Sequence, residues 1–263
     1  MAKVKIAYGG GRALGVQVLK WLSSQNDFEI VAVCPVPYEY DPDYYEQMME
    51  IIRNNHYLVC DINDLKNMPI DLGLSVNYHR IIEENILNHC RKGFYNVHHS
   101  YNLRLRGRNI TTHVLLNTLD ENIHYHGTTL HRMVPELDAG GIIASQAISI
   151  MKTDTAYTLF KKIDMLALDM LKEWIPRIAF ENVVLYEPPK EMVHKYKNSD
   201  LPSKEIKESM SSERIDVVIR AFDFPGKEPA FIMRNGKPIH LVYTKRGKYQ
   251  REFEIKGNLY YAE

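Results

Sequence analysis

The segment that runs from Phe94 to His113 contains polar residues whose types and spacing could do chemistry. If Asn96-Val97-His98-His99-Ser100 lies on a strand, then Asn96, His98 and Ser100 share one face, because side chains alternate between the two faces. An amide beside an imidazole, where a strand opens into a loop, offers an oxyanion donor next to a general acid or base. We therefore predict a catalytic pair at Asn96 and His98.

A second candidate is Asp138, which lies between two predicted strands and is followed by Ala139 and the pair Gly140-Gly141. A carboxylate in such a loop could reach back to orient an imidazole. Each feature alone has an ordinary structural interpretation. An Asn-x-His on a strand is more often structural, and an Asp before Ala-Gly-Gly is usually a turn residue.

An α/β sheet would have to position these residues. Residues 3–8 and 28–36 are predicted strands, separated by a Gly-rich turn and a helix. Further predicted strands are 56–60, 71–78, 93–100, 124–133 and 141–150. Further predicted helices are 46–55, 80–90, 109–119 and 153–179, the last broken near its end by Pro176. The expected fold is Rossmann-like α/β, with a mixed, mainly parallel sheet and helices on both faces.

The composition changes after about residue 186, where a polar Pro/Ser/Lys-rich stretch begins. We predict a catalytic domain over 1–185, and a linker with a small C-terminal domain over 186–263. Arg234-Asn235-Gly236 is a strong hairpin signal in the second part.

The amino-acid composition disfavours several functional classes of protein. Lys+Arg and Asp+Glu are both 33 of 263 residues, so the formal net charge is zero, which weakens any assignment as a nucleic-acid binder. Three widely spaced cysteines form no disulfide framework, and no segment resembles a signal peptide or a membrane span. We expect a soluble cytoplasmic protein that uses neither nucleic acid nor membrane. His124 and His126 share a strand face, but no third ligand follows, so no catalytic metal is expected.

The Gly-rich turn contains Gly9, Gly10, Gly11 and Gly15 between a strand and a helix. Its spacing is not GxGxxG, and the next strand ends without a suitable carboxylate, so dinucleotide binding is disfavoured. The turn could simply let the helix approach the sheet. Alternatively, its backbone N–H groups and Arg12 could hold the phosphates of a substrate.

Taken together, the two motifs resemble the folate-dependent formyltransferase family over roughly residues 1–180. The family has an Asn-x-His-x-Ser strand before an Arg-Gly loop, which here is Arg106-Gly107. It then has a Gly-x-Thr-x-His strand and a Leu-Asp-x-Gly-x-Ile turn, matched here by Gly127–His131 and Leu137–Ile142. Two departures are His99, where the family commonly has Pro, and Asn102-Leu103, where it often has Leu-Pro. These departures affect loop shape near the substrate.

The resemblance implies transfer of a formyl group from N10-formyltetrahydrofolate, a co-substrate, to an amine. Asn96, His98 and Asp138 would be the catalytic triad. The resemblance also places the folate pocket near the strand before the triad and the loop after Met133. The residues concerned are Leu74, Val76, Asn77, Tyr78, Ile81 and Val134. Core packing is an equal alternative for Leu74 and Val76.

The C-terminal segment around Phe222 and the Gly236-Lys237 hairpin looks like that of nucleotide-sugar N-formyltransferases. The expected acceptor is a dTDP-linked amino-deoxy sugar, first dTDP-4-amino-4,6-dideoxyglucose and second its 3-amino counterpart, for surface polysaccharide such as O-antigen. The expected substrate contacts are Gly10, Gly11, Arg12, Ser100, Tyr101, Arg106 and Phe222. Arg104 and Arg108 are further candidates for the diphosphate.

Three alternatives stay open: a formyltransferase for another amine such as methionyl-tRNA, an NAD-linked oxidoreductase, and a non-catalytic regulator that keeps the fold. A homodimer is expected, because the small apolar C-terminal hairpin must be buried against something.

Overall fold

The structure is a computed structural model that describes residues 2–121, 123–190, 193–247 and 250–262. The chain forms two compact units. The first unit comprises residues 1–106, 127–146 and 164–194, and the second comprises 107–126, 147–163 and 195–263. The units therefore do not follow the single boundary at 185/186 that the change in composition predicts.

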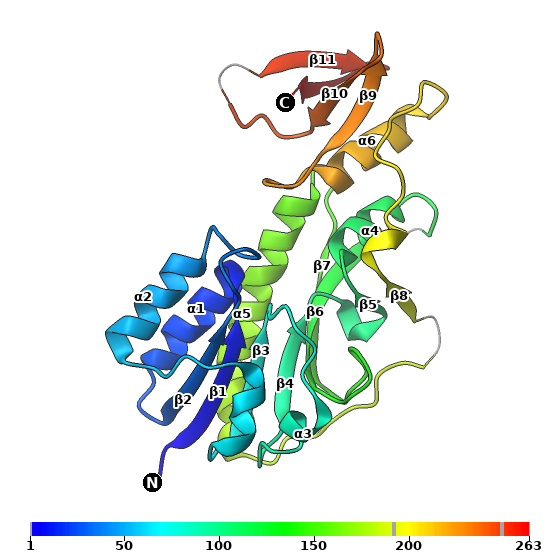
Figure 1. The fold of residues 1–263 in the computed structure, drawn as a ribbon. Coiled ribbons are helices and arrows are strands. Elements are labelled where there is room, and N and C mark those ends of the chain that lie inside the picture. The colour runs from blue at the N-terminus through cyan, green and yellow to red at the C-terminus, as the bar shows by residue number, and fades with distance from the viewer. Residues whose placement is uncertain (1, 122, 191–192, 248–249, 263) are drawn as a thin grey trace. The chain divides into compact units, whose positions relative to one another are not determined.

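A six-stranded sheet in the order β2-β1-β3-β4-β6-β7 forms the framework of the first unit (Figure 1). The strands β1, β2, β3 and β4 run parallel, and β6 is antiparallel to β4. Their bounds are β1 Val4–Gly10, β2 Phe28–Pro35, β3 Leu72–Val76, β4 Phe94–His98, β6 Tyr125–Arg132 and β7 Ile142–Ser149. The mixed, mainly parallel sheet is the predicted fold class.

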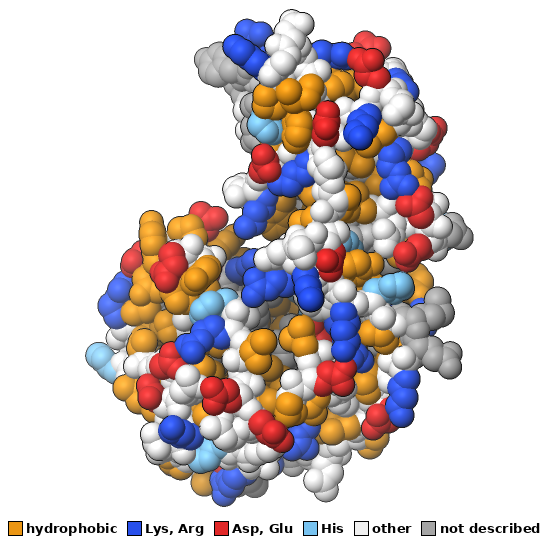
Figure 2. Space-filling model, turned by 45° about the vertical axis from the view of Figure 1, so that its right-hand side comes forward, with side chains coloured by type: hydrophobic (Ala, Val, Ile, Leu, Met, Phe, Trp, Pro, Cys, Tyr) orange, Lys and Arg blue, Asp and Glu red, His pale blue; other side chains and the backbone are white. Residues whose placement is uncertain are grey.

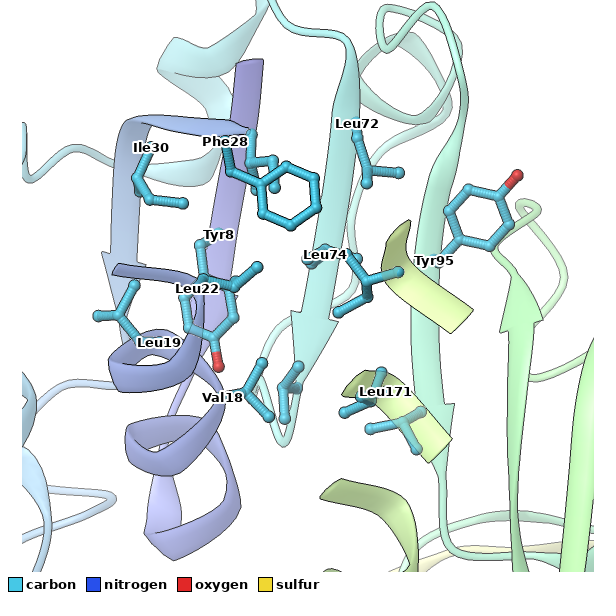
Figure 3. Packing of buried hydrophobic residues seen from close by; sticks show 14 of the residues in the cluster. Tyr8, Val18, Leu19, Leu22, Phe28, Ile30, Leu72, Leu74, Tyr95 and Leu171 are labelled. Carbon is cyan, nitrogen blue, oxygen red and sulfur yellow. The ribbon is translucent and has the colours of Figure 1, made fainter. Parts of the chain in front are cut away.

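The helices α1 (Arg12–Ser23) and α5 (Ala156–Phe180) cover one face of this sheet, and α2 (Tyr45–Asn55) lies beside α1. Apolar residues recur at helical spacing along α1, so Val18, Leu19 and Leu22 all turn toward the strands. Figure 3 shows these side chains in the same apolar cluster as Tyr8 of β1 and Leu74 of β3. Burying each such side chain contributes about 1.5–3 kcal/mol.

Shorter elements pack against the opposite face of the first four strands. These are the 3₁₀ turn η1 (Ile62–Asn67) and the helix α3 (Glu84–Leu87), which bury Ile62, Leu65 and Ile86 in a second apolar cluster. The sequence predicts a longer helix over 80–90, but only one turn forms. The segment 56–60, predicted as a strand, makes a single bridge between Val59 and Val33 and is not a full strand. Between β4 and β6 the chain forms η2 (Tyr101–Leu103), and β5 (Leu105–Gly107) pairs with β8 (His194–Tyr196).

The second unit has its own core. A sheet in the order β11-β12-β10-β9 packs on α6 (Ser212–Phe222), which also contacts α4 (Ile110–Leu116). The strands are β9 Ala230–Arg234, β10 Lys237–Val242, β11 Arg251–Ile255 and β12 Asn258–Ala262, and η3 (Asn198–Asp200) precedes α6. Positive φ at Asn235 and Gly236 confirms the predicted hairpin turn.

Two further observations concern the whole chain. Pro176 does not break α5, which continues to Phe180; the proline removes one hydrogen bond in the last turns and the helix tolerates it. Among the described residues, no helix has the length and apolarity needed to span a bilayer. Figure 2 shows Lys and Arg side chains intermixed with Asp and Glu on the visible face, as the balanced charge predicts.

Candidate active site

The carboxyl end of β4 carries the predicted amide and imidazole on one face of the sheet. Asn96 pairs with His131 of β6, and His98 pairs with Thr129. Directly opposed residues of neighbouring strands share a face, so these four side chains lie together. The alternating residues Tyr95, Val97 and Leu130 belong to the core with α1 and α5. The polar residues therefore face away from those helices.

The amide of Asn96 is held at both ends. Its Oδ1 accepts a hydrogen bond from Ser75 Oγ at 2.9 Å, and its Nδ2 lies 3.2 Å from Nε2 of His131. Nδ1 of His131 lies 3.1 Å from the carbonyl of Arg132, which can only accept, so Nδ1 carries the proton and Nε2 accepts from Asn96. One N–H of Asn96 is thereby used, and the second is left to donate.

His131 suits this accepting role because it stays neutral. Its ring is buried, and desolvation lowers its pKa to about 4, although Asp138 acts in the opposite direction. A protonated ring would carry N–H groups on both nitrogens and could no longer accept from Asn96. Burial thus fixes the direction of the hydrogen bond and with it the orientation of the amide.

The ring of His98 is oriented by a backbone carbonyl. Its Nε2 lies 2.9 Å from the carbonyl oxygen of Leu105 and therefore carries a proton. The same nitrogen is 3.6 Å from Oδ2 of Asp138. In the neutral ring the lone pair is then on Nδ1, which makes Nδ1 the basic atom.

Asp138 reaches this position from a tightly constrained loop between β6 and β7. Its backbone φ is 51°, in the left-handed region that non-glycine residues rarely adopt. At Gly140, a Cβ would lie 1.8 Å from the carbonyl oxygen of Arg132, so no larger residue fits there. The carboxylate also lies 3.9 Å from Nε2 of His131, so it faces both imidazoles.

Comparison with known proteins identifies the family of the segment that carries these residues. Residues 54–175, which include Asn96, His98 and Asp138, match the family model described as formyl transferase. This segment is a formyltransferase domain. The predicted resemblance to that family is confirmed.

The fold is shared with solved sugar formyltransferases along nearly the whole chain. WlaRD, a sugar 3N-formyl transferase whose structure holds dTDP and 5-N-formyl-THF, is 20% identical with a TM-score of 0.79, covering 100% of this chain and 98% of that one. An N-formyltransferase from Helicobacter canadensis, in complex with folinic acid and dTDP-3-aminofucose, is 22% identical with a TM-score of 0.76 and covers 100% and 99%. A 4-N formyltransferase from Francisella tularensis is 18% identical with a TM-score of 0.74 and covers 92% and 99%.

Within the formyltransferase domain, two expected folate contacts are core residues instead. Leu74 and Val76 are buried in the cluster with α1, on the opposite face of β3 from Asn96. The residue between them, Ser75, faces the site. Sequence analysis overlooked Ser75 and the role of His131; the alternation of side chains on β3 indicates only that Ser75 lies on the other face from Leu74 and Val76.

The other expected folate contacts lie on loops. Asn77, with φ of 54°, and Tyr78 are partly buried directly after β3. Ile81 is 79% exposed, and Val134 is exposed in the loop that carries Asp138. Each of the two loops thus presents an apolar side chain to solvent.

Ser100 and Arg106 shape the loop after β4. Ser100 Oγ accepts from the backbone N–H of Leu105 at 2.9 Å, which helps to hold the carbonyl that orients His98. Arg106 is buried, with Nη1 3.3 Å from Oε1 of Glu136. Tyr101 is partly buried at the start of η2. Ser100 and Arg106 therefore have structural partners in addition to any substrate contact.

The Gly-rich turn forms the predicted connection between β1 and α1. At the N-terminus of α1, the backbone N–H of Arg12 donates to Oδ2 of Asp41 at 2.6 Å. Asp41 is buried, and desolvation raises the pKa of its carboxyl. Gly10 and Gly11 are buried beside it. A substrate phosphate at this N–H would have to displace the Asp41 carboxylate.

Phe222, an expected substrate contact, is instead a core residue of the second unit. It is 6% exposed at the end of α6 and belongs to the core of that unit. His126 is likewise buried, and its Nε2 lies 3.2 Å from Oγ1 of Thr111. In the part of the chain that the structure describes, no three His, Cys, Asp or Glu side chains group as metal ligands would.

Proposed function

We propose that this chain transfers the formyl group of N10-formyltetrahydrofolate to the amine of a nucleotide-linked amino-deoxy sugar. The observation that carries the proposal is the oriented amide of Asn96 beside the ring of His98, with Asp138 3.6 Å from that ring. The formyltransferase domain and the shared fold of sugar N-formyltransferases support the same reaction.

His98 acts as the base in this reaction. The acceptor nitrogen forms a bond to the formyl carbon, the bond from that carbon to N10 breaks, and one proton passes from the acceptor to N10. Nδ1 of His98 takes that proton because Nε2–H already points to Leu105. Asp138, facing Nε2, stabilises the imidazolium that forms.

Asn96 stabilises the negative charge that develops on the formyl oxygen. Its second amide N–H is available, while the first is directed to His131. A donor fixed before the reaction needs no reorganisation as the charge develops, which is why such groups are typically worth about 10²–10³ in rate. His98, once protonated, can return the proton to the departing N10.

The co-substrate fits the two loops that follow β3 and β6. Ile81 is exposed in the first loop, Val134 and Leu137 are exposed in the loop that carries Asp138, and Asn77 and Tyr78 are partly buried directly after β3. These residues would hold the folate ring and present the formyl group to Asn96 and His98. Binding in the crevice beyond the carboxyl ends of the strands is the general rule for open α/β sheets.

For the acceptor, a dTDP-linked aminohexose is best supported. Of the solved enzymes above, WlaRD is described as 3N and the Helicobacter enzyme holds dTDP-3-aminofucose, while the Francisella enzyme is described as 4-N. The 3-amino isomer, second in the sequence-based expectation, therefore becomes the first compound to test, ahead of dTDP-4-amino-4,6-dideoxyglucose. The product would supply surface polysaccharide such as O-antigen.

An acceptor panel tests this proposal. Purified protein and N10-formyltetrahydrofolate are incubated with dTDP-3-amino, dTDP-4-amino, UDP-amino and GDP-amino sugars and, separately, with methionyl-tRNA, and products are analysed by mass spectrometry. We expect one formyl group on a dTDP-amino sugar. Formylation of methionyl-tRNA alone would exclude the sugar acceptor, and no transfer to any amine would exclude the reaction.

A further inference from the structure

Two cysteines outside the candidate active site lie in contact. Sγ of Cys34 and Sγ of Cys60 are 3.7 Å apart. Their backbones are held in register by the bridge between Val33 and Val59, in which Val33 N–H donates to the Leu58 carbonyl at 2.8 Å and Cys60 N–H to the Val33 carbonyl at 3.3 Å. The proximity of the two thiols is therefore built into the end of β2.

The two thiols differ in access. Cys34 is buried, whereas Cys60 is only partly buried. Cys60 also lines a cavity of about 280 Å³, whose other walls are Pro35, Pro37, Tyr45, Val59, Asp61, Tyr78, His79 and Arg80. A small reagent can therefore reach Cys60 first, with Cys34 directly behind it.

The two thiols also differ in acidity. A hydrogen bond from the Cys34 thiol lowers the pKa of Cys60, although burial and the carboxylates of Asp64 and Asp61 act in the opposite direction. The same hydrogen bond and burial raise the pKa of Cys34. Cys60 is thus the attacking thiolate and Cys34 the proton-bearing partner, because the thiolate is the nucleophilic form.

We propose that Cys34 and Cys60 are a reversible modification site that forms an intramolecular disulfide by exchange with a small-molecule disulfide. The Cys60 thiolate attacks one sulfur of the reagent, which yields a mixed disulfide and releases one thiolate. Cys34 then loses its proton, attacks Sγ of Cys60 and expels the second thiolate. The two cysteines are oxidised together by two electrons, and the reagent is reduced to two thiols.

The bond would tie β2 to the segment between α2 and η1, which in turn contacts the loop that follows β3. Asp61, the neighbour of Cys60, forms an ion pair with Arg80, which lies in that loop together with Tyr78. The oxidised chain would therefore restrain a segment that also lines the cavity. The site itself does not depend on the proposed formyl transfer.

The third cysteine provides an internal control. Cys90 is buried, and burial raises its pKa to about 12, so it should not react in the folded chain. The native protein is incubated with oxidised glutathione, then denatured and alkylated, and its intact mass is measured. We expect the number of alkylated thiols to fall from three to one, the remaining one being Cys90, and dithiothreitol to restore all three.

Single variants separate the two steps. Cys34→Ser should stop at a stable glutathione adduct on Cys60, Cys60→Ser should form neither adduct nor disulfide, and Cys90→Ser should behave as wild type. Circular dichroism confirms that each variant is folded. Three alkylated thiols in oxidised wild type, or a wild-type adduct on Cys60 that never resolves, would overturn the proposal.

Discussion

At the residue scale, Asn96 needs both of its neighbours to present the correct end of its amide. Ser75 donates to Oδ1, and neutral His131 accepts from Nδ2. A carbonyl turned toward the developing oxyanion would repel it, so the orientation of the amide has a direct effect on rate. Neither neighbour has to touch the substrate to have this effect.

Removing the Ser75 hydroxyl should therefore impair chemistry more than binding. We predict that Ser75→Ala lowers kcat about 10-fold, while KM for the acceptor changes little. This loss is smaller than the about 10²–10³-fold decrease in kcat that is typical when the donor itself is removed. Steady-state kinetics measures both. Ser24→Ala, on the exposed end of α1, is the matched control. An unchanged kcat in Ser75→Ala would show that His131 alone orients the amide.

The low pKa of His131 predicts an acid-sensitive stability. The folded chain resists protonation of this ring until about pH 4, whereas the unfolded chain takes up the proton near 6.5. Between these values the unfolded state binds more protons, so the free energy of unfolding falls as pH falls, by at most roughly 3 kcal/mol. Urea denaturation at pH 7 and pH 5 should show a steeper loss in wild type than in His131→Gln. Equal losses would contradict a neutral, buried His131.

The residues of the site were predictable to different degrees. Asn96, His98 and Asp138 belong to motifs with fixed spacing, so sequence alone could propose them; the structure places Asn96 and His98 on one face of β4 and Asp138 3.6 Å from His98. Ser75 belongs to no such motif, and only the pairing of β3 with β4 places it beside Asn96. The unexpected role of Asp41 at the N-terminus of α1 depends on a contact across 29 residues that no local pattern encodes.

At the element scale, the end of β4 is linked to α5. Nε2 of His99 lies 3.1 Å from Oδ1 of Asp164, and both side chains are largely buried. His99 is one of the two departures from the family pattern noted in the sequence analysis, where the resemblance leads to an expectation of Pro. A proline would fix the backbone by its ring, whereas here a polar contact between two elements can restrain the strand end that carries His98.

Loss of that contact should destabilise the fold. We predict that Asp164→Ala lowers the free energy of unfolding by about 1–3 kcal/mol, because it leaves the buried His99 ring without this partner. Chemical denaturation measures the difference. Asp169→Ala, on the exposed face of the same helix, should change the free energy of unfolding by less than about 0.5 kcal/mol. Similar values for the two variants would show that the His99–Asp164 contact is not stabilising.

Element types were easier to predict than element ends. Periodicity correctly predicted the strands that became β1 to β4 and the long helix α5. It overestimated the length of the helix at 80–90, where only Glu84–Leu87 is helical. Three apolar residues of this segment reach the core from a loop and one helical turn, so their spacing did not require a longer helix. Strand β11 was not predicted, since its charged residues alternate with only Phe253 and Ile255.

At the scale of the whole molecule, two units are assembled from interleaved segments. Residues 107–126 and 147–163 belong with the C-terminal part of the chain. Composition changes only near residue 186, so it could not show that earlier segments complete the second core. Leu115 and Leu159 lie in that core with Phe222, and only long-range packing places them there.

The homodimer remains a prediction at this scale. The four-stranded sheet buries one face on α6, while Met233 and Leu259 stay exposed. Light scattering after gel filtration should give about twice the 30.6 kDa of one chain. If these side chains lie in the interface, the double variant Met233→Lys with Leu259→Lys should have a measured mass closer to that of the monomer. A wild-type mass of one chain would exclude the dimer.

The most direct test of the central claim is the single-turnover rate of formyl transfer in His98→Ala, measured together with the affinity for 5-formyltetrahydrofolate. If Asn96, His98 and Asp138 carry the reaction, His98→Ala should lose at least about 10²-fold in rate and retain folate affinity within about 2-fold, as expected for general base catalysis. His124→Ala, an exposed histidine outside this group, should match wild type in both measurements. Formyl transfer at the wild-type rate in His98→Ala would contradict the account.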